Sequence, residues 1–236
     1  MKKYNCLFFD MDGTFADSRD FHVKAFHRFF SRYDQEMDME TIRNGMGMTI
    51  KIIFDNLGIP EDRHVDLFHK LCRFYSGEAD DLIAGIKVAG GFRDVLQSLK
   101  KEGYKIAVIT NSVQHLVDRI LVIHGLRDCF DLVAGAELQF LDKEERCLGA
   151  MESLHAKKSG ILYIGDAEWD FRIANALGFD SCFAYTDISW CEDYEYTMNV
   201  LRPAYMIRTL EELPVLLNRQ AGPAPEKQPL YLTNKA

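Results

Sequence analysis

Short apolar runs of strand length alternate with amphipathic helical patterns, and this alternation constrains the fold more than any other feature of the chain. Five runs are apolar on both faces, which is typical of central strands in a parallel sheet; they cover residues 4–10, 104–112, 129–136, 160–166 and 180–186. Helical patterns occupy residues 90–104, 112–126, 143–156, 169–179 and 209–217. The alternation predicts an α/β fold, a Rossmann-like parallel sheet sandwiched by helices.

Residues 18–89 interrupt this rhythm. They show no convincing strand and are typical of several helices separated by turns. We therefore predict a helical cap domain at 18–89, inserted into a catalytic core made of 1–17 and 90–218. The Pro-rich, polar tail at 219–236 is expected to be disordered. Six aromatic residues of the insert are assigned to its own core: Phe26, Phe29, Phe30, Phe54, Phe68 and Phe74.

The composition argues against several classes of protein. The chain of 236 residues has 36 acidic and 28 basic side chains, a net charge of -8 and no basic run, so nucleic acid is not an expected partner. The first apolar run stops at Asp10, too early for a secretory signal, and no later segment approaches a membrane span. The 6 cysteines form no CxxC pair, which is typical of a reducing compartment. We expect a cytoplasmic monomer or weak homodimer with no membrane partner.

Acidic and polar side chains follow the ends of the predicted strands. They are Asp10 and Asp12 after the first, Thr110, Asn111 and Ser112 after the second, and Asp166 and Asp170 after the fourth, with Lys143 opening an intervening helix. Ligands of open parallel sheets bind beyond the carboxyl ends of the strands, so these groups are expected on one rim. Clustered carboxylates repel one another unless a cation neutralises them, and Mg²⁺ takes carboxylate oxygens, waters and substrate phosphate. A simple tight turn at Asp12-Gly13 would explain only one of these strand ends.

Four segments resemble the motifs of the haloacid dehalogenase-like superfamily, in the same order. They are DMDGT at 10–14, VITNS at 108–112, Lys143, and GDAEWD at 165–170. The insert after the first motif is similar to a C1-type cap, as in the phosphoglycolate phosphatase and β-phosphoglucomutase branch. The resemblance covers nearly the whole chain except the tail. It implies a Mg²⁺-dependent phosphatase that hydrolyses a small phosphorylated metabolite through an aspartyl-phosphate.

The resemblance also implies roles for the carboxylates. Asp10 would be the nucleophile, and Asp12 the general acid and base. Mg²⁺ would be bound by the Asp10 side chain, the Asp12 backbone carbonyl and the Asp166 side chain, with Asp170 supporting them. An acid at Asp12 favours phosphate transfer over dehalogenation, because a halide leaving group needs no proton.

The remaining roles concern the phosphoryl group and the substrate. By resemblance, Thr110 and the backbone of Asn111 would hold the transferring phosphoryl group, and Lys143 would balance its charge. Lys143 has a simpler interpretation as a surface residue at a helix start. Lys157 and Lys158 lie just before a strand, at the wrong edge for the rim.

Four further residues carry open alternatives. Asn111 and Ser112 fit a helix cap as well as a phosphate site. Arg43 precedes the Gly-rich stretch at 44–49 and either binds a second anionic group of the substrate or is a solvated helix-end residue. His22 either faces the cleft or is structural.

Other functions remain as rivals of the phosphatase interpretation. A phosphomutase would use the same residues and return the phosphate to a sugar. A phospho-accepting signalling module of the receiver type also uses Asp, Thr and Lys at strand ends, but it is shorter and has no cap. A catalytically silent binding protein would not need the full motif set, and a glycosidase-type carboxylate pair would leave the lysine and threonine without a role.

Overall fold

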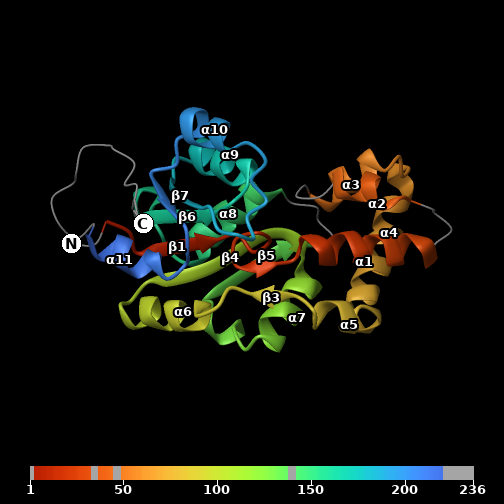
Figure 1. Ribbon diagram of the computed structural model, residues 1–236, viewed down its shortest axis with the longest axis horizontal. Helices are drawn as coiled ribbons and strands as arrows, with labels where there is room; N and C mark the ends of the chain where they lie inside the picture. The colour runs from red at the N-terminus through yellow and green to blue at the C-terminus, as the bar shows by residue number, and fades with distance from the viewer. Residues whose placement is uncertain (1–2, 33–36, 45–48, 138–141, 220–236) are drawn as a thin grey trace, which may run out of the picture.

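A six-stranded parallel sheet forms the centre of the computed structural model, which describes residues 3–32, 37–44, 49–137 and 142–219. The strand order is β5-β4-β1-β6-β7-β8 (Figure 1). The strands are β1 (Cys6–Phe9), β4 (Lys105–Val113), β5 (Leu132–Ala136), β6 (Ile161–Gly165), β7 (Asp180–Ala184) and β8 (Tyr205–Ile207). The expected Rossmann-like α/β fold is confirmed. The edge strand β8 was not predicted, because three residues are too few to show a pattern.

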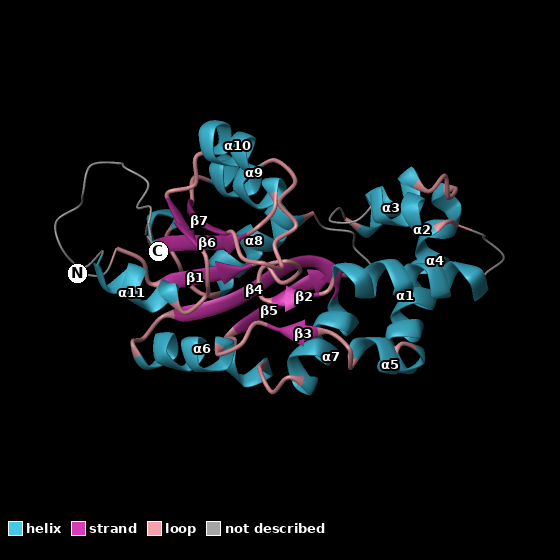
Figure 2. Ribbon diagram, viewed as in Figure 1, coloured by secondary structure: helices cyan, strands magenta, loops and turns pink. Residues whose placement is uncertain are grey.

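Two layers of helices cover the sheet (Figure 2). One face carries α6 (Phe92–Lys101), α7 (Gln114–Ile123) and α11 (Glu212–Arg219), and the other carries α8 (Lys143–Ser153) and α9 (Glu168–Leu177). Strand β1 contributes to both cores: Leu7 and Phe9 pack on the first face, and Cys6 and Phe8 pack on the second. A parallel strand covered on both sides is therefore apolar at every position.

The insert between β1 and β4 is mainly helical and lies at one end of the sheet, at the right of Figure 1. It contains α1 (Arg19–Arg32), α2 (Met39–Asn44), α3 (Ile50–Asn56), α4 (His64–Arg73) and α5 (Asp80–Ile83). All six of its phenylalanines named above are buried. Between α5 and β4 the chain returns to the core. None of the described helices is long and apolar enough to cross a membrane.

A two-stranded antiparallel ribbon joins the insert to the core. Its strands are β2 (Ala16–Asp17) and β3 (Lys87–Val88). The expectation that 18–89 contains no strand is therefore wrong at β3, which exists because it pairs with β2 and is too short to show periodicity. The boundaries 1–17, 18–89 and 90–218 stay a prediction. Of the tail 219–236, only Arg219, the last residue of α11, lies among the described residues.

The segment after β7 adds a small third cluster. It contains α10 (Tyr194–Tyr196) and a π-helical turn, Thr197–Leu201. Phe171 of α9 packs edge-on against Phe183 of β7 with ring centroids 5.2 Å apart, and Leu201 is buried with them. This packing holds the loop 185–193 near the carboxyl ends of β6 and β7.

Candidate active site

One pocket collects side chains from the ends of β1 and β4, the starts of α8 and α9, and the helical insert. The predicted residues Asp10, Asp12, Thr110, Asn111 and Lys143 all line it. Its volume is about 60 Å³. One water needs roughly 10–15 Å³ on this measure, so the pocket has room for a few groups of that size. The pocket lies beyond the carboxyl ends of the strands, as an open parallel sheet requires.

Lys143 reaches the pocket because helix α8 begins there. Asp142 caps the helix by accepting a hydrogen bond from the Glu145 N–H at 2.9 Å, and the Glu145 carboxylate accepts one from the Asp142 N–H at 3.0 Å. This capping box sets the first turn of α8. Lys143 Nζ then lies 2.7 Å from Asp10 Oδ1 and 2.6 Å from Asp170 Oδ1. With 5% exposure, Lys143 is a buried ion-pair partner and not a surface residue.

Asp166 and Asp170 enter from the segment that joins β6 to α9. Asp166 is fully buried and accepts hydrogen bonds from Thr14 Oγ1 at 2.8 Å and from the Trp190 N–H at 2.5 Å. Asp170 Oδ2 accepts hydrogen bonds from the N–H groups of Asp166, at 3.1 Å, and Ala167, at 3.0 Å. The prediction that Asp170 supports the other carboxylates from the first turn of α9 matches this geometry.

Gly13 lets the loop after β1 pass close to Asp166. Its φ is +78°, which favours glycine, and a Cβ built there would lie 2.4 Å from Asp166 Oδ2 and 2.6 Å from Trp190 Cδ1. No side chain fits into this contact. The glycine of DMDGT is thus required both by its backbone angle and by the approach of the carboxylate.

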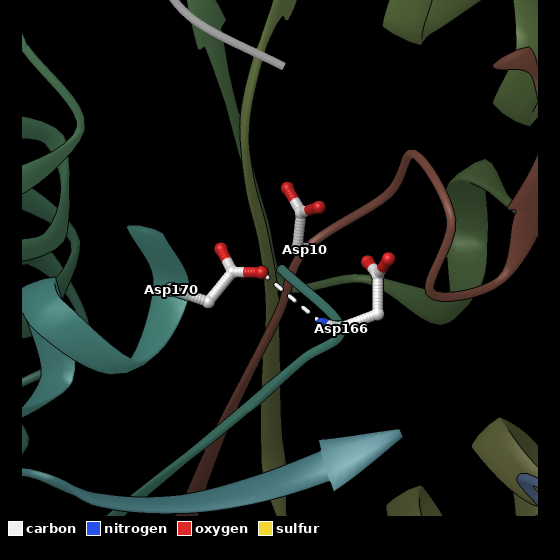
Figure 3. Close-up of side chains that lie close together, drawn as sticks. All are labelled: Asp10, Asp166 and Asp170. Atoms are coloured by element: carbon white, nitrogen blue, oxygen red, sulfur yellow. Dashed lines mark hydrogen bonds between the residues drawn. The ribbon is translucent and has the colours of Figure 1, made fainter. Parts of the chain in front are cut away.

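The carboxylates of Asp10, Asp166 and Asp170 converge (Figure 3). One oxygen from each lies within 4.8 Å of the others. Burial raises the pKa of Asp10 to about 7, with Lys143 opposing and Asp170 and Asp12 adding to the rise. Burial, followed by the charges of Asp170 and Asp10, also holds the pKa of Asp166 well above its ordinary value. Such a site lacks positive charge, and a divalent cation with oxygen ligands fits it.

Asp12 lies in a different environment from Asp10. Its Oδ1 accepts a hydrogen bond from Ser18 Oγ at 2.5 Å and lies 2.8 Å from His22 Nε2. Its Oδ2 accepts hydrogen bonds from Ser112 Oγ at 2.6 Å and Thr110 Oγ1 at 3.2 Å. Burial by itself would raise the pKa of Asp12, but His22 and the two serines outweigh it and lower the pKa to about 2.

The end of β4 supplies the polar side chains of the opposite wall. The pairing of β4 with β5 shifts register between Ile109 and Val113, so the strand continues past Thr110 and does not stop there. Asn111 Oδ1 accepts a hydrogen bond from Arg146 Nη2 at 2.7 Å. Helix α7 starts after Val113 without a side-chain cap. The alternative in which Asn111 or Ser112 caps this helix is therefore wrong, because both side chains are bonded elsewhere.

The structure does not bring Arg43 to the pocket. Arg43 ends α2 with an exposed side chain, and its guanidinium lies 4.0 Å from the carboxylate of Asp20. It does not line the pocket, so the geometry favours the solvated interpretation of Arg43. Residues 45–48 of the Gly-rich stretch lie outside the described residues. Lys157 and Lys158 are exposed before β6, at the opposite end of that strand from Asp166.

Several residues of the site were not assigned a role from the sequence. They are Thr14 and Trp190, which hydrogen-bond to Asp166, and Ser18, which hydrogen-bonds to Asp12. Ser112, expected at a helix cap or a phosphate site, hydrogen-bonds to Asp12. For His22 the sequence allows either a position facing the cleft or a structural role. In the structure His22 contacts Asp12 and lines the pocket. Phe26 was assigned to the core of the insert alone, yet it also lines the pocket. The serines and Thr14 adjoin or lie within the motifs, which was the available signal; Trp190 had none.

Comparison with known proteins identifies the family. The model of the haloacid dehalogenase-like hydrolases matches residues 7–184, three quarters of the chain. The chain therefore belongs to the haloacid dehalogenase-like hydrolase family, and it is an enzyme of the phosphatase type. The signalling module, silent binding protein and glycosidase alternatives are excluded by this membership.

Individual relatives are distant but cover the chain almost fully. The pyrophosphatase PpaX of Bacillus anthracis is 22% identical over 92% of this chain and 97% of its own length. A predicted phosphatase of Clostridium acetobutylicum superposes with a TM-score of 0.76 at 24% identity, over 92% of this chain and 99% of that one. A predicted phosphoglycolate phosphatase of Haemophilus somnus gives a TM-score of 0.73 at 16% identity, over 92% and 99%. At these identities the structural likeness concerns the fold alone.

Proposed function

We propose that this chain is a Mg²⁺-dependent phosphatase of a small phosphorylated metabolite that works through an aspartyl-phosphate. One observation carries the proposal. Three buried carboxylates, Asp10, Asp166 and Asp170, converge, and one lysine, Lys143, pairs with two of them, Asp10 and Asp170. When all are ionised the cluster has three negative charges against one positive charge, an excess of two. A divalent cation would cancel this excess, and an anionic substrate could then approach.

The residues fit Mg²⁺ by the nature of their donors. The carboxylate oxygens of Asp10 and Asp166 and the backbone carbonyl of Asp12 would hold it. Burial and neighbouring negative charges raise the pKa values of Asp10 and Asp166, and a bound cation would supply the positive charge that opposes this effect. When bound, the cation neutralises charge on the phosphoryl oxygens. Asp170 is already engaged by Lys143 and two N–H groups, so it positions its neighbours and leaves the metal to them.

Asp10 is the nucleophile in this proposal. Its Oδ1 is bonded to Lys143, and its carboxylate lines the pocket, where it can attack phosphorus opposite the leaving oxygen. The new bond joins a carboxylate oxygen to phosphorus, and the bond from phosphorus to the leaving oxygen breaks. Water then attacks the aspartyl-phosphate and restores the carboxylate. Lys143 stays charged throughout, because Asp10 and Asp170 outweigh the effect of burial and raise its pKa.

Asp12 transfers the protons. In the free site its low pKa of about 2 makes it a carboxylate, the form that takes a proton from the attacking water. A phosphate dianion placed beside it raises the pKa of a carboxyl group, which favours the protonated form that serves the leaving oxygen. Ser18, Ser112 and His22 fix its orientation.

The test of activity is phosphate release from a panel of phosphomonoesters in the presence of Mg²⁺. We expect Asp10→Asn to lower the rate at least ~10³-fold, because the nucleophile is lost. Asp62→Asn, an exposed carboxylate outside the pocket, is the matched control and should retain the full rate. Undiminished turnover by Asp10→Asn would remove the nucleophile assignment. Sugar monophosphates that isomerise without releasing phosphate would indicate the phosphomutase alternative.

The test of the metal uses stability and does not need turnover. A cation that binds only the folded chain at 100 times its Kd adds about 2.7 kcal/mol to the free energy of unfolding. We expect Mg²⁺ to raise the unfolding midpoint of the wild type, and not of Asp166→Asn. Ca²⁺ should not restore phosphate release in a chelated sample, because it prefers looser and higher coordination. An equal shift in Asp166→Asn would place the cation elsewhere.

A further inference from the structure

Both tryptophans of the chain line the same pocket. The sequence contains 2, Trp169 and Trp190. They are distant from Asp10 along the chain and line the same pocket as Asp10 in the structure. Trp169 stands in the first turn of α9 and exposes 51% of its surface. Trp190 belongs to the loop after β7. The proposed chemistry uses neither indole, so their presence beside the reacting groups calls for another explanation.

The helical insert adds an apolar wall to the same pocket. This wall consists of four residues that line the pocket: Phe26 of α1, Ile50 and Ile53 of α3, and Tyr75. Leu116 of α7 continues this surface on the core side. The part of the pocket beyond the carboxylates is therefore lined by aromatic and aliphatic groups, the kind of surface that binds an apolar body.

Positive charge is scarce in this pocket. Among the described residues that line it, Lys143 is the one lysine or arginine, and it is paired with Asp10 and Asp170. His22 is engaged by Asp12. The internal stretches outside the described residues, 33–36, 45–48 and 138–141, contain no lysine, arginine or histidine. Two arginines lie over the indoles without lining the pocket: the guanidinium of Arg19 is 5.3 Å from the ring centroid of Trp190, and that of Arg172 is 5.9 Å from the ring centroid of Trp169. A second carboxylate or phosphate inside the pocket would therefore meet no lysine or arginine among the described lining residues besides Lys143.

Trp190 adds a neutral hydrogen-bond donor. Its Nε1 is buried and has no hydrogen-bond partner among the described residues. Its backbone N–H meanwhile holds Asp166, and its ring lies edge-on to His22 with centroids 5.9 Å apart. Buried donors are normally paired, so this unpaired N–H, on a residue that lines the pocket, marks Trp190 as a residue whose hydrogen bonding the described chain leaves incomplete.

We propose that the substrates are phosphomonoesters whose leaving group is apolar and flat and carries no second negative charge. The leaving group packs between the wall of the insert and the indoles of Trp169 and Trp190. This inference rests on the proposed phosphatase function and deepens it. It separates this chain from enzymes that split pyrophosphate or phosphoglycolate, whose leaving groups are anions.

The test compares benzyl phosphate with 2-phosphoglycolate, whose leaving groups are both primary alkoxides, so that the type of leaving oxygen is the same and the charge differs. Inorganic pyrophosphate, whose leaving group is phosphate, is a third substrate. We expect kcat/KM with Mg²⁺ to be at least ~10-fold higher for benzyl phosphate than for 2-phosphoglycolate, about 1.4 kcal/mol of preference. A higher kcat/KM for 2-phosphoglycolate or pyrophosphate, or equal values, would overturn the inference while leaving the phosphatase function intact.

Variants at Trp169 test the role of the indole. Trp169→Ala should lower kcat/KM for benzyl phosphate by ~3–10-fold, the usual worth of an aromatic contact, and should lower the value for 2-phosphoglycolate by a clearly smaller factor. Trp169→Phe should recover most of the loss. The side chain is half exposed, so folding is expected to survive, and the unfolding midpoint checks this. An equal loss on both substrates would contradict a role in binding the leaving group.

Binding measurements separate the two hypotheses. In Asp10→Asn, benzyl phosphate should quench the fluorescence of the tryptophans with a Kd at least ~10-fold below that for 2-phosphoglycolate. If no phosphomonoester is hydrolysed by the wild type, the proposed function fails, and this titration still decides the preference for an apolar ligand. Equal or reversed affinities would sink the inference.

Discussion

The two walls of the pocket differ in how their side chains are held. On the wall from the sheet, the carboxylates are held by directional contacts, from the single ion pair of Asp10 with Lys143 to the four partners of Asp12, which are Ser18, His22, Ser112 and Thr110. On the wall from the insert, residues such as Phe26 contribute apolar surface packed on the core of the insert. Ser18 and His22 are exceptions, because both lie within residues 18–89 and contact Asp12.

This contrast indicates which of the two walls tolerates amino-acid substitution. Hydrogen bonds and ion pairs are directional, so a small displacement on the sheet side leaves a buried charge unpaired. Apolar contacts are not directional, and their area can be supplied by several residue types. We therefore expect the sheet wall to determine the reaction and the insert wall to select the substrate.

The largest effect is expected at Lys143. Lys143→Met leaves Asp10 and Asp170 buried without their cation, which should lower the free energy of unfolding by ~3–5 kcal/mol and abolish most phosphate release. Urea unfolding and the phosphate assay measure both effects. Lys158→Met, an exposed lysine, is the control and should change neither. A fully stable and active Lys143→Met would show that the ion pairs do not matter.

A moderate loss of stability is expected at Gly13. In Gly13→Ala the new residue must adopt a positive φ, and its Cβ would lie 2.4 Å from Asp166 Oδ2. We therefore expect the free energy of unfolding to fall by ~1–3 kcal/mol and turnover to be reduced. Gly77→Ala is the matched control, because nothing lies within 4 Å of its added Cβ. Thermal unfolding of the two variants gives the comparison. Equal melting curves for the two would contradict the close-packing argument.

A smaller loss is expected at Ser112. Ser112→Ala removes one donor from Asp12 while Ser18, His22 and Thr110 remain, so ~1.5 kcal/mol of stability and a several-fold fall in kcat are expected at neutral pH. Ser31→Ala, whose hydroxyl bonds a backbone carbonyl on the surface, serves as the control. If kcat were unaffected by Ser112→Ala, the orientation of Asp12 would not depend on this hydroxyl.

The smallest effect is expected at Arg43, on the insert. Arg43→Ala removes an exposed side chain 4.0 Å from Asp20, so stability should change by less than ~0.5 kcal/mol and KM by less than about twofold. Steady-state kinetics on a phosphomonoester measures this. A large rise in KM for anionic substrates alone would show that Arg43 reaches the substrate after all and would weaken the proposed preference for uncharged leaving groups.

Part of this architecture was predictable because strands and helices have periods. The apolar run of β1 has every residue buried, and β4, β5, β6 and β7 were found in the same way. The motif residues Asp10 and Asp166 follow strand ends, Thr110 lies near the carboxyl end of β4, and parallel strands end on one side of a sheet. The short strands β3 and β8 escaped prediction, because two or three residues show no period.

Residue pattern and strand direction were enough to predict the family, the parallel sheet and the placement of Asp10, Asp166 and Lys143 at one edge of the sheet. The contacts of Ser18, Ser112 and His22 with Asp12, and the hydrogen bond from the Trp190 N–H to Asp166, depend on how the chain packs. A hydrogen bond needs its two atoms within about 3 Å, and packing sets that distance between segments far apart in the chain. No residue pattern carries that information, so the partners of each carboxylate were visible only in the folded protein.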